Sequence, residues 1–477
     1  MITTIAKKEF VGLIRDGRFR WCAAIMIFLL LTSLWVGYNR YQSMNDTQLS
    51  AQTTTEKQWV NQDDKNPHTA AHFGNYAFKS PGPLSFFDNG ISNFVGSTIW
   101  LEAHKTNFAK NRPAQDNGGL SRFGELTPAM TLQLLMPLML ILLGFSAFAG
   151  ERDAGTLRQL VSLGVGGNTL LWGKLLGVLV TVSLILLPYI VICGFVLTFV
   201  EGTGSVELGV RGWLLCLAYS LYSLTYMFLI MGVSAAARTA KSALVILVGF
   251  WAFASFIIPR AATDISKVLT PTPGYAQFYK SVKDTSLSGL KGAEGDVALP
   301  SRAHLAKVRQ SLFDQYDVDS VEDLPVYWTA VSMQTIEERD YIINDQLMEK
   351  LRQSFQIQHR QRDIVGFLSP VLALRSVSMA LAGTSLVDQE EFIRSAHQYR
   401  INMIRDMNTE LINNATMGDA LYIAGSDTFS MVEPYRYTAP SMRESLAPLK
   451  HNIVISVLWF CLAWLFALTS TRRMAVL

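Results

Sequence analysis

The chain has 477 residues, of which 50% are hydrophobic and only 17% are charged. This composition excludes an ordinary soluble globular domain, and a net charge of +3 gives no sign of nucleic-acid binding. We therefore analyse the chain as a membrane protein.

The first 20 residues are predicted to form a cytoplasmic amphipathic helix that lies on the membrane surface, with Lys8, Glu9 and Phe10 in its middle. Residues 21–38 form the first apolar run. Because no small-residue cleavage site follows this run, we expect a membrane span and not a signal peptide.

Residues 39–127 contain prolines, glycines and Asn/Asp clusters, which are typical of a loop-heavy insert. Three histidines in this insert raise the question of a metal site, because His68 and His72 have the i, i+4 spacing of one helix face. Pro67 adjoins His68, and the sequence shows no nearby third ligand beyond the more distant His104. We expect solvent-exposed polar histidines and no metal.

Five further apolar runs approach the roughly 20 helical residues that cross a bilayer. They cover residues 128–149, 171–200, 213–236, 242–258 and 451–471. Pro259 sets the end of the run that begins at 242, because proline interrupts the helical hydrogen-bond ladder.

The short loops carry the charges that set orientation. Six spans place both termini on one side, and the segments on that side hold twelve Lys and Arg against four Asp and Glu. We expect this side to be the cytoplasm, with residues 39–127 and 259–450 forming two extracytoplasmic inserts.

The inner loop 150–170 follows the second predicted span and contains Gly-Glu-Arg-Asp-Ala-Gly-Thr-Leu from Gly150 to Leu157. Glu151 and Asp153 are placed to begin a short amphipathic helix that a soluble partner can grip. The loop resembles the coupling segment of ABC-2-type permeases, usually Gly-Glu-Arg-Glu-x-Gly-Thr-Leu, and departs from it after Ser162. The triplet at Lys8 resembles the Lys-Glu-Phe opening of the same family. This resemblance assigns ATPase coupling to Gly150, Glu151, Arg152, Gly155, Thr156, Leu157 and Leu160.

The nearest match to a phosphate-binding loop ends at Gly173-Lys174-Leu175 and lacks both the required first glycine and the final hydroxyl residue. We therefore expect no catalytic residue or cofactor in this chain, with ATP and Mg²⁺ on a partner ATPase. Lys174 is predicted to be a cytoplasmic anchor that extends its ammonium group to the membrane surface.

Within the span 213–236, polar side chains recur on one helical face. Tyr219, Tyr222, Ser223 and Tyr226 suit a transport pathway wall, and ordinary helix packing explains them as well.

The large insert 259–450 is predicted to be mainly helical. A stripe from Ile336 to Phe355 indicates one long helix, and Asp388 and Glu391 indicate the start of a second. Residues between these two helices and on the second one resemble motifs of a branch of the ABC-2-type permeases. This branch carries a domain of unknown function in its last outer loop. The motif residues are Ser369, Pro370, Gly383, Thr384, Tyr399 and Arg400. Ser369 and Pro370 are expected to cap and start a helix that Gly383 ends.

The sequence thus predicts an all-α polytopic membrane protein with six transmembrane helices. The resemblance implies an export permease in the bacterial cytoplasmic membrane, working as a homo- or heterodimer with two cytoplasmic ATPases. The alternative is a mechanochemical or assembly component that acts on periplasmic partners without transporting a substrate. The substrate itself is not indicated.

Overall fold

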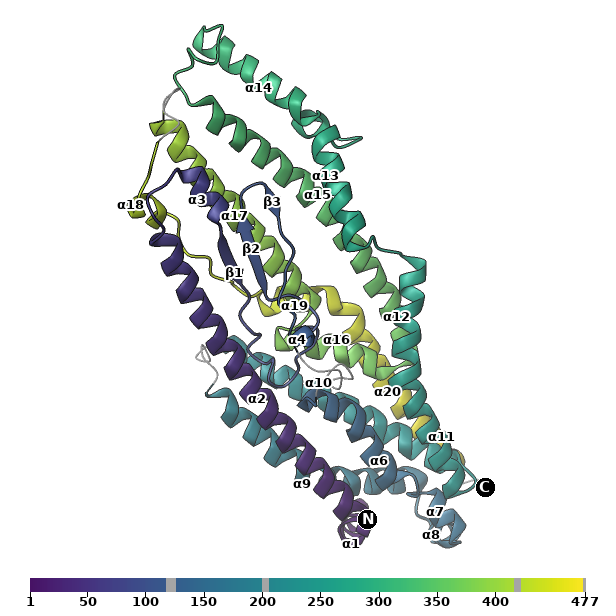
Figure 1. The fold of residues 1–477 in the computed structure, drawn as a ribbon. Coiled ribbons are helices and arrows are strands. Elements are labelled where there is room, and N and C mark those ends of the chain that lie inside the picture. Colours follow the sequence, from purple (N-terminus) through teal and green to yellow (C-terminus); the bar gives the residue numbers. More distant parts are fainter. Residues whose placement is uncertain (117–125, 200–205, 416–421, 475–477) are drawn as a thin grey trace.

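The computed structural model describes residues 1–116, 126–199, 206–415 and 422–474. The molecule is elongated and almost entirely helical, with long helices running along its length (Figure 1). Within these described ranges, seven helices are long and apolar enough to cross a membrane. The predicted fold class is therefore confirmed, although the number of candidate spans is one higher than expected.

The N-terminal segment forms helix α1 (Ile2–Arg15), which a bend at Asp16 separates from α2 (Gly17–Val60). The Asp16 side chain accepts hydrogen bonds from the backbone and side chain of Arg18, so it caps the second helix. Helix α2 has 44 residues and, at 1.5 Å per residue, is about 66 Å long. It therefore continues far beyond the predicted span 21–38.

The extension of α2 into residues 39–60 was predicted as loop and is the largest error in the first insert. This stretch contains no glycine or proline, so nothing in it breaks a helix. Contacts with the chain's C-terminal half stabilise it: Gln52 donates to the Tyr435 carbonyl at 2.8 Å and Trp59 Nε1 donates to the Phe429 carbonyl at 2.9 Å.

The other predicted spans each overlap a helix that is a candidate span. The second comprises α5 (Pro128–Met130), a π-helical segment η2 (Thr131–Leu135) and α6 (Met136–Gly144). The third and fourth are α9 (Gly167–Leu197) and α10 (Val206–Ala236), and the last is α20 (Lys450–Met474). The predicted end of the third span, Val200, lies outside the described residues.

The helix that contains the fifth predicted span does not end at Pro259. It runs through α11 (Ala240–Ala252), a π-helical segment η3 (Phe253–Ile257) and α12 (Ile258–Leu269). A π-helical segment also precedes Pro137 in the second span. A wider turn next to a proline lets the helix accommodate the missing N–H and continue.

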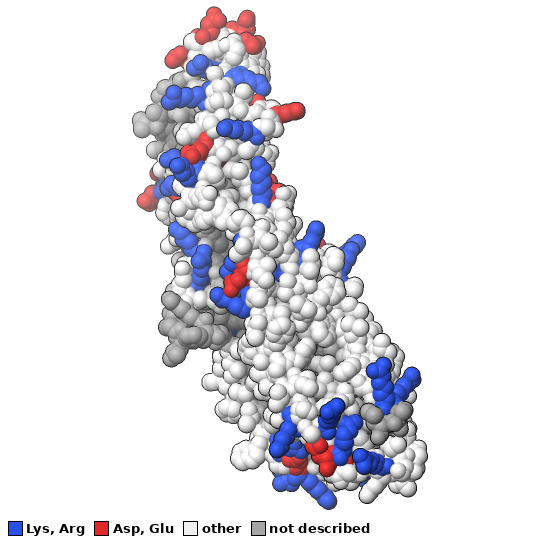
Figure 2. Space-filling view, turned by 90° about the vertical axis from the view of Figure 1, so that its right-hand side faces the viewer, with Lys and Arg blue, Asp and Glu red and all other residues white. Residues whose placement is uncertain are grey.

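Large apolar side chains on these helices point outward. Trp21, Phe28, Val191, Phe195 and Val245 are each more than half exposed. Exposure of so large an apolar surface to water is energetically unfavourable, so this surface contacts lipid. Figure 2 shows the corresponding white belt, with Lys and Arg gathered at the end below it.

The seventh candidate window lies in Pro370–Asn414. Its apolar part is α16 (Pro370–Ala382), which Gly383 ends with φ 73° before α17 (Leu386–Asn414). Thirteen residues span only about 20 Å, short of the about 30 Å hydrocarbon core. The window is also 78% buried inside the protein.

The first insert adds α3 (Pro67–Phe73), α4 (Pro113–Asp116) and a small antiparallel sheet. Its strands are β1 (Asn75–Phe78), β2 (Thr98–Glu102) and β3 (Lys105–Thr106), with Tyr76 opposite Trp100 and Glu102 opposite Lys105. His104 lies in the turn between β2 and β3 and comes close to His68 and His72. The prediction of solvent-exposed histidines is correct for His72 and His104 and wrong for His68, which is buried. The expectation of no nearby third histidine is wrong, because the sheet brings His104 to α3.

The large insert consists mainly of α13 (Tyr275–Ser288), α14 (Ser301–Tyr316), α15 (Trp328–Val365), α16 and α17. Short helices follow at α18 (Ser426–Ser430) and α19 (Met442–Leu446). The long helix predicted around Ile343 is confirmed as α15. The second is confirmed as α17, but Ser385 and Asp388 form its capping box, so it begins two residues before Asp388. Phe392 and Met403 of α17 are buried together with Trp59 and the sheet.

Candidate functional site

The loop after the second span folds into two short helices, α7 (Ala149–Asp153) and α8 (Thr156–Ser162). Gly155 separates them in the left-handed conformation, with φ 74°, which residues with a side chain rarely adopt. Leu157 is buried against the core, whereas Leu163 directly after α8 is 80% exposed. The predicted two-turn amphipathic helix is therefore present, at the end of the molecule where α1 begins and α20 ends (Figure 1).

The acidic residues of this loop do not begin α8 as predicted. Glu151 and Asp153 lie in α7, on the other side of the Gly155 turn. Asp153 instead accepts a hydrogen bond from the Ala240 backbone at 2.9 Å, at the start of α11. The loop is thus bound to a neighbouring span through a helix N-terminus.

Glu151 belongs to a group of four charged side chains, which we call the Lys174 cluster: Lys8, Glu9, Glu151 and Lys174. Lys174 Nζ lies 2.8 Å from Glu9 Oε1 and 2.9 Å from Glu151 Oε1. Lys8 Nζ also lies 2.9 Å from Glu151 Oε1. The cluster therefore joins α1, α7 and α9, and its two positive and two negative charges balance.

The side chain of Lys174 is only 2% exposed. The prediction that it extends to the membrane surface is therefore wrong, because two carboxylates compensate its charge inside the protein. Burial raises the pKa of Glu151, but Lys174 and Lys8 outweigh this effect and hold the pKa of the carboxyl below its usual value. Glu151 is thus ionised at neutral pH.

Two glycines bring α1 close enough to α9 for these ion pairs to form. A Cβ atom on Gly173 would lie 2.6 Å from the Ile5 side chain, and one on Gly177 would lie 2.6 Å from Glu9 Cβ. The Gly-x-x-x-Gly spacing puts both on one face of α9, where small residues permit close helix packing. Sequence reasoning missed this pair, although the spacing was readable.

Arg152 and Ser234 attach the same loop to the end of α10. The Arg152 guanidinium donates to the carbonyls of Ala235, at 2.8 Å, and Ala237. Ser234 Oγ accepts from the Phe148 and Ala149 backbone N–H groups at 3.0 and 3.2 Å. Sequence analysis singled out Arg152 and overlooked Ser234, a buried hydroxyl with no motif around it.

The remaining residues of the predicted coupling segment, Gly150, Thr156 and Leu160, make contacts within the protein. A Cβ on Gly150 would lie 3.1 Å from Ser146 Cβ, and Thr156 Oγ1 donates to the Glu151 carbonyl at 3.2 Å. Leu160 packs against the core, and Phe10 is half-buried on α1. Exposed side chains of α8 and the next residue form one continuous surface: Thr156, Arg158, Gln159, Ser162 and Leu163.

The four polar residues of α10 named above are buried, and Tyr219, Tyr222 and Ser223 form hydrogen bonds. Tyr219 accepts from Gln133 at 2.9 Å, and Tyr222 donates to the Gln133 carbonyl at 2.8 Å. Ser223 and Tyr226 are also buried. Only Tyr222 also lines the apolar pocket that α10 forms with α16 and α20, next to Leu221, Thr225 and Leu374. All four residues lie on α10, but Tyr219, Ser223 and Tyr226 do not line this pocket.

In the large insert, Pro370 and Gly383 bound α16 as predicted. Ser369 does not cap the helix with its side chain; it donates to the Ala254 carbonyl at 2.6 Å, in the π-helical segment η3. Thr384 Oγ1 donates to the Asp88 carbonyl at 3.0 Å in the first insert.

The last two motif residues lie on α17. Tyr399 stacks edge-on against Tyr435 with a centroid distance of 5.5 Å. Arg400 lies 3.1 Å from Glu337 and donates to the Glu102 carbonyl at 3.1 Å. The motif residues thus connect α16 and α17 to the spans, to α15 in the same insert and to the first insert.

Comparison with protein-family models gives two matches. The model described as ABC-2 family transporter protein matches residues 3–293, and the model of a domain of unknown function, DUF3526, matches residues 288–437. No curated protein matches the chain.

Proposed function

Because the chain belongs to the ABC-2 family of transporter proteins, whose model covers residues 3–293, we propose that it is the permease subunit of an ATP-driven exporter. Membership makes it a multi-pass membrane component of an ABC transporter, and it implies association with an ABC ATPase. Export, a dimer of permeases with two ATPases, and a place in a bacterial cytoplasmic membrane belong to the proposal.

The proposed topology has six crossings. The start of α1 and the end of α20 lie at the same end of the molecule, which supports an even number (Figure 1). Lys and Arg gather at this end, which favours the cytoplasmic side (Figure 2). We assign α16 to the outer ends of the spans as a buried helix that does not cross, so most of both inserts faces outward.

The observation that carries the coupling proposal is the Lys174 cluster. It holds the loop between the second and third spans against α1 and α9, while Arg152 and Ser234 hold the same loop against α10. A partner that displaces α8 would therefore move several helices together.

ATP binding and hydrolysis would take place on the partner ATPase, with its own Mg²⁺. The exposed surface Thr156 to Leu163 offers that partner an apolar tip at Leu163 and a positive charge at Arg158. Movement of α8 would then change the packing of α9 and α10, where Tyr219, Tyr222, Ser223 and Tyr226 form part of our proposed pathway wall.

A co-purification experiment tests the coupling surface. Arg158→Glu reverses one exposed charge on α8, and Arg238→Glu is a matched control outside the loop, also exposed and on the same side. We expect Arg158→Glu to reduce the amount of ATPase subunit that co-purifies, and Arg238→Glu to retain it. Equal recovery with both variants would contradict the proposal.

A second function, mechanical action on outer partners, is favoured by the continuous helices. Helix α2 and the helix from α11 to α12 each run from the membrane belt into the outer region without a described break. Such rods can transmit a displacement over their full length.

Reconstitution of the permease with its ATPase in liposomes separates the two functions. In inside-out vesicles, ATP-dependent uptake of a compound from the medium into the lumen supports export. ATP-dependent change in the accessibility of the outer inserts, without uptake of any compound in a metabolite mixture, supports mechanical action.

A further inference from the structure

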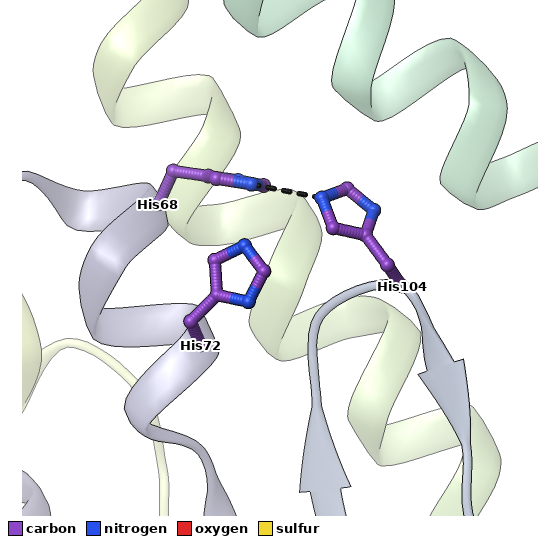
Figure 3. Close-up of side chains that lie close together, drawn as sticks. All are labelled: His68, His72 and His104. Atoms are coloured by element: carbon purple, nitrogen blue, oxygen red, sulfur yellow. Dashed lines mark hydrogen bonds between the residues drawn. The ribbon is translucent and has the colours of Figure 1, made fainter.

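Three histidines in the outer part of the molecule lie around one point (Figure 3). His68 and His72 come from α3, and His104 comes from the turn between β2 and β3. One ring nitrogen from each lies within 4.8 Å of the other two. We propose that His68, His72 and His104 bind one divalent transition-metal ion, with Zn²⁺ as the best fit. This inference goes beyond the proposed transport function and does not depend on it.

The local fold holds two of the ligands on one helix face. Asn66 caps α3 by accepting a hydrogen bond from the His68 backbone N–H at 2.9 Å, and Pro67 occupies the first turn. His68 and His72 are then one helical turn apart and point the same way. Their rings are 4.9 Å apart between centroids.

The third ligand is fixed by a strained turn. His104 has φ 61°, which is uncommon for a residue with a side chain. Its backbone N–H donates to Glu337 Oε1, and its Nδ1 lies 2.8 Å from the same oxygen. Glu337 is buried and also pairs with Arg400, so the carboxylate that orients His104 is itself held in place.

Hydrogen bonds on the far sides of two rings determine which nitrogens are free. Asn408 Nδ2 donates to Gln334 at 2.9 Å, so Asn408 Oδ1 faces His68 Nδ1, also at 2.9 Å, as an acceptor. His68 Nδ1 must therefore carry the proton. A carboxylate only accepts, so His104 Nδ1 carries the proton as well.

When both rings are neutral, their Nδ1 protons leave the two Nε2 atoms facing each other with lone pairs only. His68 Nε2 and His104 Nε2 are 3.0 Å apart. In this neutral state, the two nitrogen lone pairs repel each other unless a cation lies between them. A metal ion satisfies both, and the ring of His72, with its centroid 5.1 Å from that of His104, supplies a third nitrogen.

The donor set favours zinc. In a tetrahedral site, Zn–N bonds of about 2.0–2.1 Å place the nitrogens roughly 3.3 Å apart, close to the separation of the two Nε2 atoms. Imidazole suits zinc, copper and nickel, and is a poor ligand for Ca²⁺ or Mg²⁺. The contacts from Glu337 and Asn408 match the outer partners that orient metal-bound histidines in proteins.

The position of the site implies a role in joining the two outer inserts. The ligands come from the first insert, and the orienting residues Glu337 and Asn408 come from α15 and α17 of the large insert. His72 and His104 are exposed, so the fourth coordination position opens to the surface. Water or a group from another molecule can occupy it there.

Equilibrium dialysis of the purified full-length chain with buffered Zn²⁺, after removal of metal with a chelator, tests the proposal. We expect one Zn²⁺ per chain. His72→Ala and His104→Ala each remove a ligand and should weaken affinity at least about 100-fold, and Glu337→Gln should weaken it about 10-fold, within the range known for outer-shell partners. The control His451→Ala, an exposed histidine on α20, should bind as the wild type does.

Binding of Cu²⁺ provides a readout of ligand type, because electron paramagnetic resonance detects coupling to imidazole nitrogen. We expect this coupling in the wild type and its reduction in His72→Ala. Melting curves recorded in chelator verify that the variants fold, which the exposed positions of His72 and His104 favour. Less than about one tenth of a Zn²⁺ per chain at saturation, or unchanged affinity in the double variant His72→Ala/His104→Ala, would overturn the proposal.

Discussion

At the residue scale, buried charged side chains hold α1, α7 and α9 together. Sequence analysis identified Lys8, Glu9 and Glu151 through a family resemblance, but it placed Lys174 at the membrane surface. The reason is that a lysine near the end of an apolar run has the same sequence pattern whether it reaches water or pairs inside the protein. Only the packing of α1 against α9 reveals its partners.

Replacement of Lys174 by methionine tests the buried cluster. Lys174→Met removes the buried cation that Glu9 and Glu151 share and leaves them only the exposed Lys8, so we expect a loss of about 3 kcal/mol of stability, as for other broken buried ion pairs. Lys8→Met, at a side chain that is 67% exposed, should cost less than about 1 kcal/mol. Thermal unfolding of the detergent-solubilised chain measures both. Equal effects of the two substitutions would contradict the assignment.

Glu390 on α17 gives a pH prediction. Burial raises the pKa of this carboxyl from 4.5 to about 7, although Arg352 acts in the opposite direction. The folded state therefore keeps a proton that the unfolded state releases, and stability from this group is lost as the pH rises through 7. Glu390→Gln should be more stable than the wild type at pH 8, by about 1 kcal/mol after allowance for solvent screening, and similar to it at pH 4.5.

Melting temperatures measured between pH 4.5 and pH 8 check this difference. The control Glu433→Gln, at an exposed position, should follow the wild type at every pH. A constant difference between Glu390→Gln and the wild type across the range would show that Glu390 does not titrate as described.

At the element scale, hydrophobic runs located six of the seven candidate spans among the described residues, because about 20 consecutive apolar residues have few alternatives to a membrane helix. Their ends were harder to predict. Helix α2 continues through a polar stretch because tertiary contacts of Gln52 and Trp59 stabilise it. Pro259 lies inside a continuing helix because a π-helical segment precedes it. Both features depend on neighbours that the local sequence does not show.

The packing of α1 on α9 yields a prediction for these elements. Gly177→Leu would place a side chain against Glu9 and Ala6, so we expect α1 to separate from α9 at a cost of about 1–3 kcal/mol. Gly194→Leu, on the same helix, meets open space and is the matched control. Cysteine labelling at Phe10→Cys measures the exposure of α1. The rate should increase with Gly177→Leu and stay unchanged with Gly194→Leu; no increase would contradict the packing.

At the scale of the whole molecule, charge sorting is the basis of the orientation that we propose, and the structure adds that the start of α1 and the end of α20 lie at the same end of the molecule (Figure 1). The sequence could not reveal the histidine cluster, because its ligands depend on a strand turn that brings His104 to α3. Nor could it reveal how the two outer inserts join, since Thr384 and Arg400 reach the first insert through long-range contacts.

Topology can be tested with a membrane-impermeant maleimide in a chain lacking its natural cysteines. Six crossings predict that Leu287→Cys is labelled from outside, whereas Lys7→Cys and Arg473→Cys react only after the membrane is permeabilised. If α16 were a seventh crossing, the two termini would lie on opposite sides. Labelling of only one terminal cysteine from outside would therefore exclude the six-span arrangement.

The central claim is that an ABC ATPase contacts this permease at α8 and the residue after it. Photo-crosslinking in intact membranes, with a photoreactive amino acid in place of Leu163, tests it most directly, and the same substitution at Leu287 in the outer domain is the control; both side chains are more than half exposed. We predict a crosslinked adduct with an ATPase subunit from position 163 and none from position 287. The absence of an ATPase adduct at position 163, or equal adducts at both positions, would contradict the account.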